Sequence, residues 1–83
     1  MLYARLNKEL RSNYLKKLIN IGFKPQFKEQ EIINSPYPFA VDLDNKIVAH
    51  LTTPSYSAAA LMNDAILDDD EFIKQIDEYI NKI

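Results

Sequence analysis

The chain has 83 residues, which makes one small domain that hides only about 60% of the surface its unfolded form exposes. It carries a formal charge of −2 and no cysteine, which excludes a disulfide framework and a thiolate metal site and fits a cytoplasmic protein. Hydrophobic residues make up 47% of the chain, and no apolar run approaches the roughly 20 residues of a membrane span, so we expect a packed domain without a membrane segment.

Charge is distributed unevenly between the two halves of the chain. Residues 1–41 hold seven basic and three acidic residues, whereas residues 42–83 hold three basic and nine acidic ones. Two interpretations stay open. In the first, two helix faces of opposite charge are simply exposed to solvent. In the second, a basic surface binds an anionic partner or leads to head-to-tail self-association.

A helix is predicted over residues 2–21. An apolar residue recurs at every fourth position, which is the spacing of one helix face. Gly22, the only glycine, suits the left-handed residue that follows a helix, and Pro25 prevents continuation. The repeating residues are Leu2, Leu6, Leu10, Tyr14 and Leu18.

Three strands are expected next, at about 26–33, 39–44 and 47–52. The first is the weakest and suits a sheet edge, because its Glu and Gln residues are poor strand formers. The other two flank Asp44-Asn45-Lys46, and turn-forming residues between apolar runs predict a hairpin. A three-residue loop would make one face of this hairpin wholly apolar. The expected pairs are Leu43 with Ile47, Val41 with Ala49 and Phe39 with Leu51, and the other face would carry Ala40, Asp42, Val48 and His50.

Two helices are predicted after the hairpin, over residues 54–66 and 69–83. Pro54 suits a first helical position, and Asp68 with Glu71 forms a capping-box pattern at the start of the last helix. The apolar face of that last helix is broad, so it either packs onto the domain or meets a partner. The first of these helices has a small-residue face of Ala58, Leu61, Met62, Ala65 and Ile66, and the second has a face of Phe72, Ile73, Ile76, Tyr79, Ile80 and Ile83.

This arrangement resembles the double-stranded-RNA-binding domain over about residues 13–67. Residues 22–27 (GFKPQF) are similar to the family's G-L-K-P-x-Y segment, and residues 39–41 and 45–49 are similar to its second and third strands. The resemblance implies one α+β domain over residues 1–83 with the order α-β-β-β-α-α. Its three-stranded antiparallel sheet would be packed on one face by helices.

The chain departs from this family at the positions with which the family binds RNA. The family's lysine cluster falls on Ser55, Tyr56 and Ala59, none of which is basic. Because neutralised phosphates supply most of the affinity for a duplex, the loss of this cluster should weaken binding by orders of magnitude. Weak double-stranded-RNA binding through the basic end of the first helix is the alternative function, and it would use Lys16, Lys17, Asn20, Lys24 and Lys28.

We therefore expect a non-catalytic protein-interaction module that forms a homodimer or binds and regulates a larger protein, as small accessory or inhibitor proteins of phages and bacteria do. Members of the resembling family without the lysine cluster often pair through the third strand and the last helix. An exposed strand edge can extend its sheet into a second molecule. The expected interface consists of Val48, His50, Leu51, Phe72, Ile76, Tyr79, Ile80 and Ile83.

No pattern in the sequence predicts an enzyme, a cofactor or a metal site. His50 is the only histidine and would lie diagonally across from Asp42, but a lone strand histidine is more often structural than catalytic. Its titration near neutral pH would make association pH-sensitive if it lay in an interface. The D-x-D-x-K pattern of residues 42–46 sits at a hairpin tip, where turn chemistry explains Asp44 and Asn45.

Overall fold

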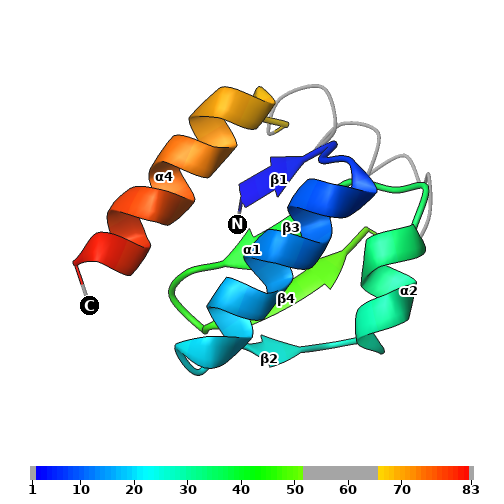
Figure 1. Ribbon diagram of the computed structural model, residues 1–83, viewed down its shortest axis with the longest axis horizontal. Helices are drawn as coiled ribbons and strands as arrows, with labels where there is room; N and C mark the ends of the chain where they lie inside the picture. Colours follow the sequence, from blue (N-terminus) through cyan, green and yellow to red (C-terminus); the bar gives the residue numbers. More distant parts are fainter. Residues whose placement is uncertain (1, 52–65, 83) are drawn as a thin grey trace.

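The computed structural model describes residues 2–51 and 66–82, which form an α+β arrangement with a mixed sheet (Figure 1). The sheet order is β1-β3-β4-β2. The β1–β3 and β3–β4 pairs are antiparallel, and the β2–β4 pair is parallel. The described strands are β1 (Leu2–Ala4), β2 (Lys24–Pro25), β3 (Phe39–Asp42) and β4 (Ile47–His50), and the described helices are α1 (Lys8–Asn20), α2 (Glu29–Asn34) and α4 (Asp69–Asn81).

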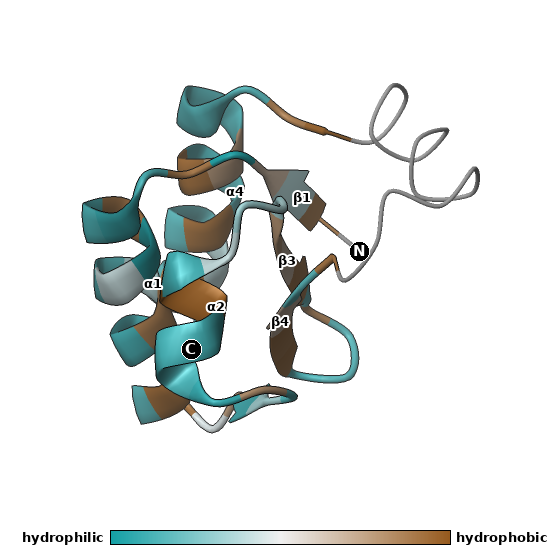
Figure 2. Cartoon of the chain, turned by 90° about the vertical axis from the view of Figure 1, so that its right-hand side faces the viewer, coloured by the Kyte–Doolittle hydropathy of each residue, from teal (hydrophilic) through white to brown (hydrophobic). Residues whose placement is uncertain are grey.

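The three helices of the described residues lie on one face of the sheet (Figure 2). The core fills the space between these two layers, and Phe39 of β3 meets Phe72 of α4 edge to face with ring centroids 5.9 Å apart. Helices on one face were expected, but the three-stranded antiparallel sheet was wrong, because β1 and β2 extend the hairpin on both sides. The buried core cluster consists of Ala4, Leu6, Tyr14, Leu15, Leu18, Phe23, Ile32, Phe39, Val41, Val48, Phe72 and Ile76.

The helix predicted over residues 2–21 begins only at Lys8. Asn7 caps it, since the Asn7 Oδ1 accepts a hydrogen bond from the Leu10 amide at 2.8 Å. Residues before this cap form β1, which pairs with β3 in the register Leu2 with Val41 and Ala4 with Phe39. The four-residue apolar spacing continues from the strand into the helix because both elements face one core. Leu6 and Leu18 belong to that core, and Leu2 packs against it.

The predicted end of this helix is confirmed at Gly22. Its φ of 101° is a conformation that side-chain-bearing residues rarely adopt. The Gly22 amide donates to the Ile19 carbonyl at 3.1 Å and the Phe23 amide donates to the Leu18 carbonyl at 3.0 Å. This closure satisfies the last carbonyls of α1 and delivers the buried Phe23 into the core.

The strand predicted over residues 26–33 was wrong. Only Lys24–Pro25 pairs with β4, and residues 29–34 form α2 instead. Glu and Gln, which weakened the strand prediction, favour a helix. One side of this short helix reaches the core through Ile32, whose side chain is fully buried.

Arg11 holds α2 in place from the first turn of α1. Its side chain is only 5% exposed, and its guanidinium donates hydrogen bonds to four backbone carbonyl oxygens. Burial lowers the pKa of this guanidinium from its ordinary value, yet an arginine stays charged near neutral pH. The acceptors are Leu6 at 2.7 Å, Ile32 at 3.1 Å, Ser35 at 3.0 Å and Tyr37 at 2.8 Å. One buried side chain therefore joins the start of α1, the end of α2 and the segment that enters β3.

The hairpin at residues 39–50 is confirmed, but its predicted register is wrong by one residue. Phe39 pairs with His50 and Val41 with Val48, which leaves a four-residue loop over residues 43–46. Asp42 organises this loop, since its Oδ1 accepts hydrogen bonds from the amides of residues 44 and 45 at 3.1 Å each. Lys46 completes the turn with a φ of 55°. Val48 and His50 therefore share the helix-covered face with Phe39 and Val41, whereas Ala49 points to the other face.

The stability of the hairpin is expected to depend on pH through Asp42. Hydrogen bonds from the side chain and the backbone of Asn45 hold the pKa of the Asp42 carboxyl below its ordinary value. The ionised Asp42 carboxyl therefore stabilises the fold fully at pH values above its pKa in the unfolded chain. This contribution is lost as the pH falls through its lower pKa in the folded chain. We expect Asp42→Asn to lower the melting temperature at pH 7, and the gap from the wild type to shrink on acidification toward pH ~2.

Circular dichroism melts between neutral pH and pH ~2 would measure this gap. Asp44→Asn, which removes the neighbouring carboxylate of the same loop, is the matched control. A gap for Asp42→Asn that stays constant over this pH range would contradict the assignment of the shift to these hydrogen bonds.

The helix predicted over residues 54–66 falls outside the described residues except for Ile66, which forms a parallel bridge with Tyr3. The last helix runs from Asp69 to Asn81 rather than to residue 83. Its predicted capping box was wrong, because the side chain of Asp68 makes no capping hydrogen bond. Leu67 and Phe72, on either side of this cap, both pack into the core cluster.

Candidate functional site

The structure gathers the predicted basic residues at one end of the molecule. Lys16, Lys17 and Asn20 lie in the second half of α1, Lys24 lies in β2, and Lys28 precedes α2. All five side chains are exposed, and the C-terminal end of α1, β2 and the start of α2 lie along the lower edge of Figure 1.

Backbone hydrogen bonds bring one more lysine to this end. The Lys24 amide donates to the Lys46 carbonyl at 2.9 Å, which places the hairpin turn beside β2. Lys46 is exposed and was missed by the sequence prediction, because only the parallel pairing of β2 with β4 makes it a neighbour of Lys24. Lys16, Lys17, Asn20, Lys24, Lys28 and Lys46 are called the basic end below.

Lys17 and Tyr14 link the basic end to α4. The Lys17 ammonium lies 4.8 Å from the centroid of the Tyr14 ring, within the range of a cation–π contact. The Tyr14 hydroxyl donates to the two carboxylate oxygens of Asp77 at 3.1 and 3.2 Å. Burial, followed by this hydrogen bond and the charge of Asp77, raises the pKa of Tyr14. The hydroxyl therefore stays protonated and joins α1 to α4 at neutral pH.

The predicted protein interface does not form one exposed surface. Val48, Phe72 and Ile76 are fully buried in the chain's own core, so they are not available to a partner without unfolding. The broad apolar face of the last helix packs inward, which was one of the two alternatives. Of the other predicted residues, His50, Leu51, Tyr79 and Ile80 are half-buried, and Ile83 lies outside the described residues.

The side of β1 that faces away from β3 and the side of β4 that faces away from β3 both have hydrogen-bond partners. The Leu67 amide donates to the Tyr3 carbonyl of β1 at 2.9 Å. On the other side, β2 pairs with the outer side of β4, where the Gln26 amide donates to the Val48 carbonyl at 3.0 Å. The free edge expected on the strand at residues 47–52 is therefore occupied over Ile47 and Val48, and strand addition by a partner is not supported there.

His50 takes part in a small polar cluster beside α2. Its Nδ1 lies 2.6 Å from the Leu51 carbonyl oxygen and 3.1 Å from the Ser35 Oγ, and its ring lies 4.5 Å from the ring of Phe27. A carbonyl oxygen only accepts hydrogen bonds, so Nδ1 carries the proton and cannot remove one from Ser35. The expected diagonal contact with Asp42 is also absent, because Asp42 pairs with Ile47 at the other end of the hairpin.

A cleft of about 290 Å³ opens beside this cluster. Its lining residues are Glu31, Asn34, Ser35, Pro36, Tyr37 and His50. This arrangement supplies no activated nucleophile.

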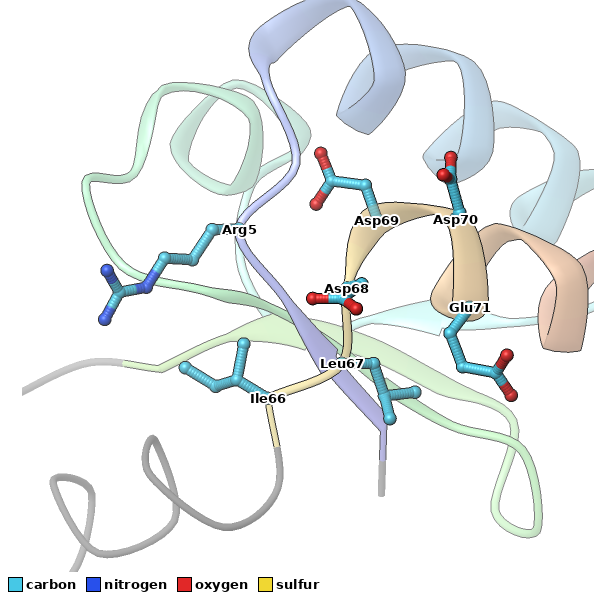
Figure 3. A pocket seen from close by; sticks show the side chains of 7 residues that line it. All are labelled: Arg5, Ile66, Leu67, Asp68, Asp69, Asp70 and Glu71. Atoms are coloured by element: carbon cyan, nitrogen blue, oxygen red, sulfur yellow. The ribbon is translucent and has the colours of Figure 1, made fainter.

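An acidic cleft of about 760 Å³ lies at the start of α4 (Figure 3). Arg5, Ile66 and Leu67 line it together with four exposed acidic residues, Asp68, Asp69, Asp70 and Glu71, which are called the acidic end below. The side chains of Asp69, Asp70 and Glu71 point in different directions and do not converge on one point (Figure 3). Among residues 2–51 and 66–82, no group of three or more histidine, cysteine or acidic side chains is placed to hold a metal ion.

Comparisons with family models, with curated proteins and with solved structures found no match to this chain. The resemblance to the double-stranded-RNA-binding domain therefore stays a prediction. The element order of the described residues is β-α-β-α-β-β-α, not the expected α-β-β-β-α-α. The positions aligned with the family's lysine cluster, Ser55, Tyr56 and Ala59, lie outside the described residues. Within the described part of the chain, no helix is long and apolar enough to cross a membrane.

Proposed function

We propose that this chain is a non-catalytic interaction module that binds an acidic surface of a protein partner through its basic end. The observation that carries the proposal is that five exposed lysines from four separate segments of the chain lie at the same end of the molecule. Glu29 follows Lys28, Asp42 and Asp44 belong to the hairpin turn that carries Lys46, and Asp77 lies across Tyr14 from Lys17. Five lysines therefore stand against four carboxylates at this end, and the balance stays positive. Charge gathered in this way accelerates encounter and selects partners of opposite charge.

A protein partner is favoured over a nucleic acid by the charge of the whole chain. The formal charge is −2, and the acidic end would be repelled by an extended phosphate backbone. All the charged side chains of the basic end are lysines, which act as point charges and do not bind phosphates in the paired geometry of arginine. A protein surface with one local acidic patch fits this arrangement better.

Double-stranded-RNA binding is the second candidate function. It is favoured by one specific observation, namely that all five residues predicted for it are exposed and lie at one end. Nucleic-acid binding by five lysines would be strongly salt-dependent, with a slope of about −0.9 for each phosphate contacted.

One variant tests both candidates. We expect the immobilised wild type to retain an acidic partner from host extract in a salt-sensitive manner, and Lys16→Glu plus Lys17→Glu to lose it. The affinity of this variant for the identified protein should be at least about tenfold lower. Lys8→Glu plus Lys74→Glu is the matched control, since it changes the net charge equally at exposed lysines outside the basic end. Mass spectrometry would identify the partner, and titration of the purified pair would measure the affinity.

Two outcomes would decide against a protein partner. Equal retention by the Lys16/Lys17 variant and the control would remove the basic end from the contact. Tight binding of duplex RNA by the wild type, with a salt slope that falls by about 2 in the variant, would favour the second candidate.

A further inference from the structure

We propose that the basic end docks a second copy of this chain, so that molecules associate head to tail. The inference rests on the proposed function and names one protein partner for it. The acidic surface is supplied by the acidic end of the neighbouring copy, where four exposed carboxylates face solvent against the single charge of Arg5. The two ends of one chain thus have complementary charge.

The placement of the two ends makes the contact open-ended. The start of α4 lies at the upper edge of Figure 1, and the C-terminal end of α1, β2 and the start of α2 lie along the lower edge. Since the two ends face opposite directions, a basic end bound to an acidic end leaves one free end on each molecule. Such a heterologous contact builds chains of molecules and does not close into a symmetric dimer.

The lining of the acidic cleft offers contacts to both parts of a lysine side chain. The acidic end borders a cleft of about 760 Å³ with Ile66 and Leu67 in its lining. The basic end presents two sets of exposed lysines. Lys46 lies in the hairpin loop, and Lys16 and Lys17 lie in α1. Lysine stems cover apolar surface while their ammonium groups stay in polar surroundings, so lysines that enter the cleft can contact Ile66 and Leu67 and reach the carboxylates around them.

The test uses two variants that each lose one end. Lys16→Glu plus Lys17→Glu reduces the side-chain charge of the five lysines of the basic end from +5 to +1, and Asp69→Lys plus Asp70→Lys reduces that of the acidic end from −4 to 0. Sedimentation at protein concentrations up to about 1 mM measures the average mass, at ionic strengths of about 0.01 M and 0.3 M. Circular dichroism confirms that each variant keeps the wild-type spectrum.

We expect the wild type to exceed its monomer mass of 9.6 kDa at low ionic strength and to return to it at high ionic strength. Each variant alone should stay monomeric. Their equimolar mixture should give a species of twice the monomer mass and nothing larger, because only one complementary pair of ends remains. The control Lys8→Glu plus Lys74→Glu should associate like the wild type.

A wild type that stays monomeric under all these conditions would overturn the inference, as would an equimolar mixture that shows no dimer. The proposed function has a separate outcome, since a monomeric wild type that still binds an acidic host protein through Lys16 and Lys17 would keep the function and remove only the second copy as the partner.

Discussion

Replacing Arg11 with methionine should lower the free energy of unfolding by about 3–5 kcal/mol. Methionine keeps much of the buried volume but donates no hydrogen bond, so four backbone carbonyls lose the donor that they have in the folded state. Each buried acceptor left without a partner costs about 1–3 kcal/mol, although some of these carbonyls will be reached by water. A domain of this size has a total stability of only about 5–10 kcal/mol, so the variant would lie close to unfolding at 25 °C.

Two further variants separate hydrogen bonding from charge at this position. Arg11→Lys keeps the charge, but its single ammonium cannot reach four carbonyls in the geometry of a guanidinium, so we expect a loss close to that of methionine. Arg5→Met removes an exposed arginine and should change stability by less than about 0.5 kcal/mol. Urea unfolding followed by circular dichroism measures all three. A loss below about 1 kcal/mol for Arg11→Met would show that these carbonyls find other partners.

The start of the chain shows how a correct spacing led to a wrong element. Leu2 and Leu6 continue the four-residue period of α1, yet Leu2 belongs to β1 and pairs with Val41. The deciding signal is Asn7, a good N-cap residue whose side chain accepts the Leu10 amide. The cap was visible in the sequence. The pairing of β1 with β3 was not, because it joins residues almost 40 positions apart.

The hairpin shows the reverse case, in which local chemistry predicted the element but not its register. Asn45 was correctly placed in a turn, but Asp42 rather than Asp44 binds the loop amides, which lengthens the loop by one residue. That one-residue change exchanges the faces of β4 and buries Val48. A predicted interface residue thus became a core residue.

Exposed lysines were easier to predict than their arrangement. Lys16, Lys17 and Asn20 follow from the pattern of one helix, since they avoid its apolar face. Lys46 joins them only through the parallel β2–β4 pair. This pair involves just two residues of each strand, which is too short for a periodic pattern to predict. Arg11 had no signal at all, because a lone arginine on a helix is normally exposed.

Ile76→Asp should unfold the protein rather than alter its association. Ile76 was predicted to lie in an interface, but it is fully buried against the core through which α4 covers the sheet. Loss of the isoleucine side chain costs about 2–5 kcal/mol, and burial of an unpaired carboxylate adds several more, which together match the stability of a small domain. We expect no cooperative unfolding transition at neutral pH.

The matched control is Lys74→Asp, which places the same carboxylate on the exposed side of the same helix. It should keep a cooperative transition within about 1 kcal/mol of the wild type, because it leaves the face around Phe72 and Ile76 untouched. Thermal melts by circular dichroism and the dispersion of amide NMR signals distinguish the two variants. A folded Ile76→Asp protein with a changed mass in solution would place Ile76 between molecules, and α4 would then need another position on the sheet.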